Sequence, residues 1–270
     1  MISGGASREA GDVVHDDRAC PATARLRLLG GWRLDSEPTI TPPLGDNSQR
    51  LITLLALRGP LSRMQIAGAM WPEISELSAS SRLRTMLWRL GGSRRLFDEA
   101  AGTLRLAPWI RVDVDEMRLR ALDLDVELAT GDAHREERPA DLTVFEADLL
   151  PGWYDDWLVV DRERFRQLRL HALEAMATLA VRSGHFAAAL DAGLAAVRAD
   201  PLRESAHRCV ICVHLAEGNT AEALRQYEAC RTVLAAELNI EPSPSLLALL
   251  PAQATSAAPI PAGRISTRSG

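Results

Sequence analysis

The chain has 270 residues, of which 47% are hydrophobic and 25% are charged, and its formal net charge is −5. This composition is typical of a globular protein with one large or two ordinary domains. No apolar run approaches the roughly 18 residues that cross a membrane, and residues 1–20 lack an apolar core, so we expect a cytoplasmic protein with no signal peptide and no membrane contact. All 31 basic residues are arginine, which excludes a P-loop lysine and Schiff-base catalysis.

The N-terminal region begins with a tail and a sheet. Residues 1–23 are predicted to be a disordered tail. Apolar and polar residues then alternate on both sides of Gly30, and a short extended segment follows at 39–41. This pattern predicts a small antiparallel sheet.

Two helices are predicted next. Residues 46–49 have helix-capping chemistry, and the apolar residues of 51–57 predict a buried helix. Ser62 and Gln65 form a capping-box pattern that opens a second helix, and Pro72 ends it.

A third helix is predicted over 79–90, where two glycines terminate it. Residues 96–97 and 103–106 can pair as a hairpin, and 110–112 form a further extended segment. Strands, two helices, a turn, a third helix and a hairpin follow one another in the order of a winged helix-turn-helix.

The third helix has two unlike faces. At about 100° per residue, one face gathers the apolar residues Ala79, Leu83, Met86, Leu87 and Leu90. The opposite face carries Ser81, Arg84, Thr85 and Trp88, and the flanks carry Arg82 and Arg89. Arginine pairs with guanine and phosphate, so this is the chemistry of a DNA recognition helix. An ordinary amphipathic surface helix is the alternative, and Arg89 could instead fix the helix to its own domain by a salt bridge.

Charge supports the DNA-binding interpretation only in part. Residues 24–113 contain 13 arginines against 8 acidic residues, although the whole chain is acidic. The expected wing, however, contains Asp98 and Glu99, which would repel phosphates. Either this wing stays off the DNA or Arg94 and Arg95 make the backbone contacts. The alternative for those two arginines is a solvated surface charge.

The second half is predicted to be helical. A helix over 113–129 and a polar loop over 130–141 precede a turn at 149–157, whose three aromatic rings we expect to anchor the loop in a core, with a ligand-stacking cage as the alternative. From residue 160 onward several small or apolar residues recur 34 positions apart, which is the tetratricopeptide period. Such helices stack into a curved domain with a groove.

His207, Cys209, Cys212 and His214 invite a metal or redox interpretation. On one helix the two histidines point to one side and the two cysteines to the other, so these four groups cannot close a tetrahedral site. We therefore expect structural thiols. We predict no metal ligands, no cofactor, no catalytic residue and no enzymatic activity.

We predict a mainly α fold. A winged helix-turn-helix with small antiparallel sheets occupies 24–113, and an all-α tetratricopeptide-like domain occupies 114–250. Tails at 1–23 and 251–270 are expected to be disordered.

Two sets of motifs resemble known families. Residues 28–32, 49–51, 61–63, 70–72, 83–90 and 103–108 resemble the OmpR-type winged helix of the Streptomyces antibiotic regulatory protein family. Residues 150–153, 157–158, 162–164, 168–174, 200–204 and 237–244 resemble the bacterial transcriptional activator domain. The resemblance covers about residues 25–250.

The resemblance implies a DNA-binding transcriptional regulator that activates a secondary-metabolite gene cluster such as one for an antibiotic. It implies a homodimer on direct repeats in double-stranded promoter DNA, and contact with RNA polymerase. The expected roles on DNA are base or sugar contacts for Arg84, Thr85 and Trp88, the groove entrance for Ser81, and phosphate contacts for Arg82 and Arg89. The alternative is a tetratricopeptide-like interaction scaffold whose winged helix no longer binds DNA. Repression would use the same DNA contacts.

Overall fold

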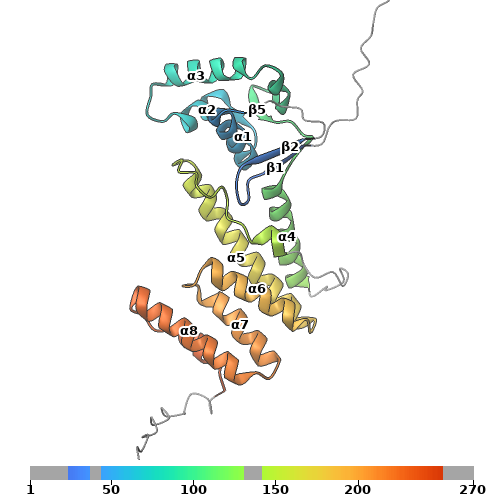
Figure 1. Ribbon diagram of the computed structural model, residues 1–270, viewed down its shortest axis with the longest axis vertical. Coiled ribbons are helices and arrows are strands. Elements are labelled where there is room, and N and C mark those ends of the chain that lie inside the picture. Colours follow the sequence, from blue (N-terminus) through green and yellow to red (C-terminus); the bar gives the residue numbers. More distant parts are fainter. Residues whose placement is uncertain (1–23, 37–43, 131–141, 252–270) are drawn as a thin grey trace, which may run out of the picture. The chain divides into compact units, whose positions relative to one another are not determined.

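The computed structural model describes residues 24–36, 44–130 and 142–251 (Figure 1). The tails predicted at 1–23 and 251–270, the strand at 39–41 and the loop at 130–141 fall wholly or almost wholly outside these residues. The chain forms two compact units. Among the described residues, the first comprises 24–27 and those of Arg33–Val112, and the second comprises Leu28–Trp32 and those of 113–251.

The first unit contains a sheet of order β2-β1-β6. β1 (Ala24–Arg27) pairs antiparallel with β2 (Arg33–Ser36), as the alternating pattern predicts. β6 (Ile110–Val112) pairs parallel with β1, so the end of the unit returns to its beginning. Leu26 at the centre of β1 is fully buried.

Three helices follow in the predicted order. α1 (Asp46–Arg58) buries every residue from Leu51 to Leu57. Its N-cap is Gly45, without a side-chain hydrogen bond, so the capping role predicted for residues 46–49 is wrong and these residues form the first turn. α2 (Arg63–Met70) begins with the predicted capping box.

The third helix starts earlier than its apolar pattern indicates. α3 spans Glu76–Arg89, and the Ser75 side chain caps it by accepting a hydrogen bond from the backbone N–H of Ser78. A 3-10 segment, η1 (Gly91–Leu96), follows α3 directly. The extra first turn adds Leu77 to the surface of α3.

The wing is a hairpin in a second sheet of order β3-β5-β4. β4 (Phe97–Ala100) pairs with β5 (Thr103–Leu106), and β3 (Leu61–Ser62) pairs with the other edge of β5. The turn consists of Ala101 and Gly102, which both have positive φ, 51° and 76°. The acidic residues of the expected wing therefore lie in strand β4 and the tip is uncharged.

The second unit is all-helical beyond its first segment. Its long helices are α4 (Asp113–Thr130), α5 (Leu158–Arg182), α6 (Phe186–Ala199), α7 (Glu204–Ala216) and α8 (Thr220–Leu238), with short helices η2 (Leu142–Phe145) and α9 (Pro244–Leu247). The 34-residue tetratricopeptide period recurs at the turns. Gly184 before α6 and Gly218 before α8 are 34 positions apart, and both have positive φ, 74° and 81°. Gly193 on α6 packs against Val210 on α7, where an added Cβ would lie 3.0 Å from a side-chain carbon.

The segment Leu28–Trp32 joins this helical unit through its backbone. The carboxylate of Asp113 accepts hydrogen bonds from the backbone N–H groups of Leu28, at 2.9 and 3.0 Å, and of Leu29, at 3.0 Å. The N–H of Leu150 donates to the carbonyl of Leu28, at 2.9 Å. Strand-like pairing and a buried carboxylate thus hold this segment within the second unit.

The aromatic turn differs from the prediction. Tyr154 is 90% exposed, and Trp153 and Trp157 are only half-buried. The aliphatic residues Leu149 and Leu150 are the buried ones, and the Arg162 guanidinium donates to both of their carbonyls. Because hydrogen bonds to the backbone already fix the turn, the tyrosine ring is not needed as an anchor.

Candidate nucleic-acid interface

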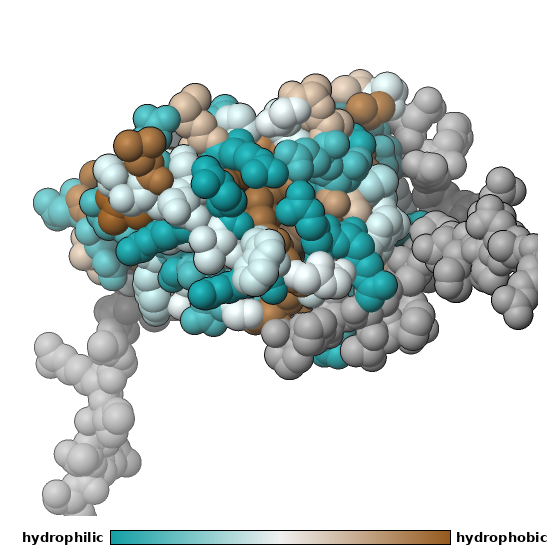
Figure 2. Space-filling view, turned by 90° about the horizontal axis from the view of Figure 1, so that it is seen from above, coloured by the Kyte–Doolittle hydropathy of each residue, from teal (hydrophilic) through white to brown (hydrophobic). Residues whose placement is uncertain are grey.

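The surface of α3 separates buried and exposed residues as its sequence predicts. Ala79, Leu83, Leu87 and Leu90 are buried, and Met86 is half-buried. The six residues that we predicted to face DNA are all exposed: Ser81, Arg82, Arg84, Thr85, Trp88 and Arg89. Figure 2 looks onto the side of the chain where Figure 1 draws α3 and shows hydrophilic residues gathered there, with hydrophobic residues visible between them.

Three arginines on α3 carry uncompensated charge. Arg82, Arg84 and Arg89 form no hydrogen bond or ion pair with any residue in the described part of the chain. The salt bridge considered for Arg89 is therefore absent within those residues. Most arginines elsewhere in the described chain have partners, so these three guanidinium groups remain available to an external anion.

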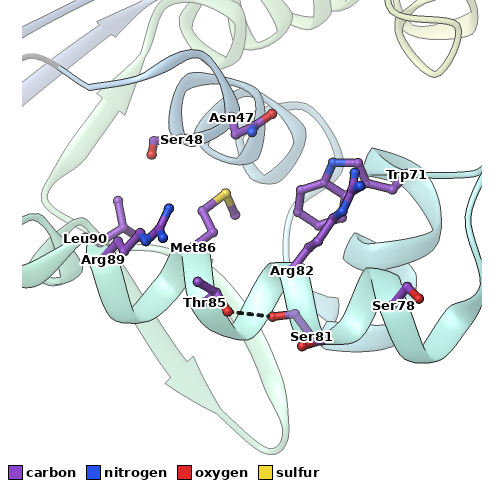
Figure 3. Close-up of a pocket in the computed structure, with 10 residues that line it drawn as sticks. All are labelled: Asn47, Ser48, Trp71, Ser78, Ser81, Arg82, Thr85, Met86, Arg89 and Leu90. Atoms are coloured by element: carbon purple, nitrogen blue, oxygen red, sulfur yellow. Dashed lines mark hydrogen bonds between the residues drawn. The ribbon is translucent and has the colours of Figure 1, made fainter.

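A pocket of about 710 Å³ lies inside the first unit, along one side of α3 (Figure 3). Its walls come from the first turn of α1, the residue after α2 and the length of α3. The lining residues are Asn47, Ser48, Trp71, Ser78, Ser81, Arg82, Thr85, Met86, Arg89 and Leu90. None of them is acidic. Figure 3 shows the Arg82 side chain extending from α3 toward Trp71, and the Arg89 side chain on the side of the pocket where Ser48 lies.

The exposed surface of α3 therefore has two parts. Arg82 and Arg89, with Ser78 and Thr85, lie on the pocket side. The Thr85 hydroxyl donates to the carbonyl of Ser81, at 3.0 Å, which fixes its orientation (Figure 3). We use the term outer face for Leu77, Ser81, Arg84 and Trp88, which at about 100° per residue fall within about 60° of one another. Ser81 lies at its boundary and also lines the pocket.

The sequence did not indicate several of these residues. Leu77 was missed because the predicted helix began at residue 79, although the spacing of Ser75 and Ser78 is that of a helix cap. Asn47 and Ser48 were assigned to capping, and they line the pocket only because the tertiary fold brings α1 beside α3.

The acidic wing residues are already paired with arginines. Glu99 accepts from Arg63, at 3.0 Å, and from Arg94, at 3.3 Å. Asp98 accepts from the Nε of Arg105, at 3.0 Å. These partners offset part of the negative charge that the wing would present to phosphates, and whether the wing contacts DNA stays a prediction. Arg94 is held by Glu99 at the base of the wing, and Arg95 beside it is exposed.

The histidine and cysteine residues of α7 lie in different surroundings: His207 is buried and hydrogen-bonded, and Cys209 and Cys212 are half-buried. The buried His207 donates through Nε2 to the carbonyl of Pro201, at 2.9 Å, and its Nδ1 accepts from the amide of Gln226, at 2.8 Å. Burial raises the pKa of Cys209 to about 12 and also raises the pKa of Cys212. No group of three or more potential metal ligands occurs among the residues that the structure describes.

No helix in the described ranges is long and apolar enough to cross a membrane.

Comparison with known proteins identifies the second unit. Residues 112–252, more than half of the chain, match the family model described as "Bacterial transcriptional activator domain". The chain is 28% identical over 244 residues to the regulatory protein AfsR of Streptomyces griseus and 29% identical over 239 residues to that of Streptomyces coelicolor. These matches cover 85% and 82% of this chain, but only 24% and 23% of the relatives, so the chain spans about a quarter of their length.

A solved structure shares the fold. Mycobacterium tuberculosis EmbR, in complex with a low affinity phosphopeptide, superimposes with a TM-score of 0.68 at 19% identity, over 84% of this chain and 64% of that one. At this identity the likeness concerns the fold alone. A winged helix followed by the matched helical domain is the arrangement that we predicted from the motifs. The chain therefore belongs to the bacterial transcriptional activator domain family, and its similarity to two regulatory proteins supports a role in transcription regulation.

Proposed function

We propose that this regulator binds double-stranded promoter DNA by laying α3 in the major groove. The observation that carries the proposal is the set of three uncompensated arginines on α3, beside a pocket without acidic lining. A major groove about 12 Å wide admits an α-helix. Arg84 then contacts base edges, while Arg82 and Arg89 contact the phosphates of one strand from the pocket side.

Asn47 and Ser48 support the backbone contact. Both lie in the first turn of α1 and line the pocket opposite the arginines. Their side chains can donate hydrogen bonds to phosphate oxygens, as polar side chains commonly do at protein–DNA interfaces. A strand of DNA backbone seated in the pocket would thus meet donors on two sides.

The resemblance to the regulatory family supports a proposal about regulation. We propose that the chain activates transcription of a secondary-metabolite gene cluster, bound as a homodimer to direct repeats and in contact with RNA polymerase. A reconstituted transcription reaction with purified RNA polymerase tests this part. More transcript from a promoter that carries the binding site would support activation, and less transcript would establish repression.

DNA binding is tested by titrating the protein against duplexes selected from a random library, at several salt concentrations. The Arg82/Arg84/Arg89 triple alanine variant should lose binding, because it removes both base and phosphate contacts. Arg84→Ala alone should cost about 1–3 kcal/mol on the selected site. The Arg82/Arg89 double alanine variant should lower the slope of log K against log salt by about 2, since each phosphate contact contributes about 0.9.

A matched control removes the same charge elsewhere. Arg198, Arg225 and Arg231 are exposed arginines of the second unit, and their triple alanine variant should bind DNA as the wild type does. A folded wild-type protein that selects no duplex, or equal losses in both triple variants, would contradict the proposed role of α3. The interaction scaffold would then be the better description of the protein.

A further inference from the structure

The outer face of α3 carries two large hydrophobic side chains in full contact with solvent. Leu77 is 86% exposed and Trp88 is 81% exposed. Both lie on the same side of the helix as Arg84, which has no partner among the described residues. Single exposed hydrophobic residues are common on protein surfaces. Here Leu77 precedes and Trp88 follows Arg84 on the same face of α3.

These residues are spread over several turns of the helix. Leu77 precedes Arg84 by seven residues and Trp88 follows it by four. At a rise of about 1.5 Å per residue, these separations are roughly 10 Å and 6 Å along the helix axis. Side chains this far apart along one helix face can reach different base pairs of a duplex, whose rise is about 3.4 Å per base pair.

The chemistry of the three side chains is specific. A guanidinium can bind O6 and N7 of guanine in the major groove through two hydrogen bonds. The thymine C5 methyl is the apolar group that base edges present in that groove, and apolar side chains contact it. Ser81 lies between Leu77 and Arg84 and carries a hydroxyl, which tolerates either a donor or an acceptor on the base beside it.

We propose that the outer face of α3 reads a guanine through Arg84 and the methyl groups of two thymines through Leu77 and Trp88. The two thymines lie on opposite sides of the guanine, because Leu77 and Trp88 lie on opposite sides of Arg84 along the helix. This inference rests on the proposed function, because it names the base pairs that a major-groove α3 recognises. The pocket side of the helix is left to the phosphate backbone.

The test removes single groups from the DNA. Duplexes selected by the wild-type protein are resynthesised with deoxyuridine in place of each thymine in turn, which deletes only the C5 methyl. Deoxyuridine at two of these positions should weaken binding by about three- to fivefold, which is the effect of losing one buried methyl group. Replacing the central guanine with 7-deazaguanine, which lacks the N7 acceptor, should weaken binding at least fivefold, the lower end of a bidentate contact of roughly 1–3 kcal/mol.

Protein variants assign each effect to a side chain. Leu77→Ala should make binding insensitive to deoxyuridine at one position, and Trp88→Ala should do so at the other. Arg84→Ala should abolish the response to 7-deazaguanine. Leu119→Ala is the control, because Leu119 is a 64% exposed leucine on α4 that should leave every response unchanged. Circular dichroism checks that the variants keep their helix content.

Different results separate this inference from the proposed function. Selected sites that bind tightly but respond to no deoxyuridine would overturn the thymine contacts and leave DNA binding intact. Leu77→Ala and Trp88→Ala variants that keep the wild-type responses, yet lower transcription with RNA polymerase on a saturated promoter, would assign these side chains to a protein partner and overturn the inference. A protein that selects no duplex at all would overturn both proposals together.

Discussion

At the scale of single residues, Cys209 shows how its surroundings decide reactivity. Its Sγ faces the backbone carbonyl of Glu174, 3.9 Å away, and burial, with a smaller contribution from the Glu174 carboxylate, raises the pKa of the thiol to about 12. Compared with an ordinary thiol pKa of 9.0, a pKa of about 12 lowers the thiolate fraction at pH 8 by about a thousandfold. We therefore expect iodoacetamide to alkylate Cys209 about a thousand times more slowly in the folded protein than in urea, measured by peptide mapping. Equal rates in both states would show that the thiol is not shielded.

At the scale of secondary structure, the turn of the β4–β5 hairpin can be stabilised by a single substitution. Ala101 adopts φ 51° and precedes Gly102 at φ 76°, a conformation that favours Asn-Gly over Ala-Gly. Since alanine at positive φ costs about 1–2 kcal/mol and asparagine tolerates it better, Ala101→Asn should raise the free energy of unfolding of the first unit by about 0.5–1 kcal/mol. Urea unfolding measures the change. Ala100→Asn, placed in strand β4, should not stabilise the unit, and a gain there as large as at Ala101 would contradict the argument.

The sequence predicted which side of α3 is exposed, but it did not predict the ion pairs of the wing. The exposure of Arg82, Arg84 and Arg89 followed from the helical period, because local geometry alone decides which side of α3 a residue occupies. The pairing of Glu99 with Arg63 did not follow, since the two residues are 36 positions apart and meet only after β3 and β4 join the same sheet. The types of the elements were therefore predictable from the sequence. The ion pairs of the wing carboxylates and the set of residues that line the pocket were not, because both depend on tertiary contacts.

At the scale of the whole molecule, the two units are interleaved along the chain, because Leu28–Trp32 belongs to the second unit. A fragment of residues 113–250 lacks the N–H donors that the Asp113 carboxylate uses, and it lacks the fully buried Leu28. We expect a synthetic peptide of residues 27–33 to bind this fragment and to stabilise it by about 2.7 kcal/mol at a free peptide concentration of about 100 times its Kd, measured by urea unfolding. Asp113→Ala in the fragment, or a scrambled peptide, should remove most of the gain. A fragment that ignores the peptide would show that the helices hold together without it.

The position of Leu28–Trp32 also bears on how such regulators can exchange parts in evolution. A single crossover near residue 113 would join one parent's helical unit to the other parent's Leu28–Trp32 segment. The backbone pairing of that segment is generic, but its buried leucine must fit a cavity shaped by the other lineage. Recombination that transfers this five-residue segment together with the helical unit preserves the packing of the leucine. We therefore expect functional chimaeras to have one junction on each side of the segment and a third near residue 113.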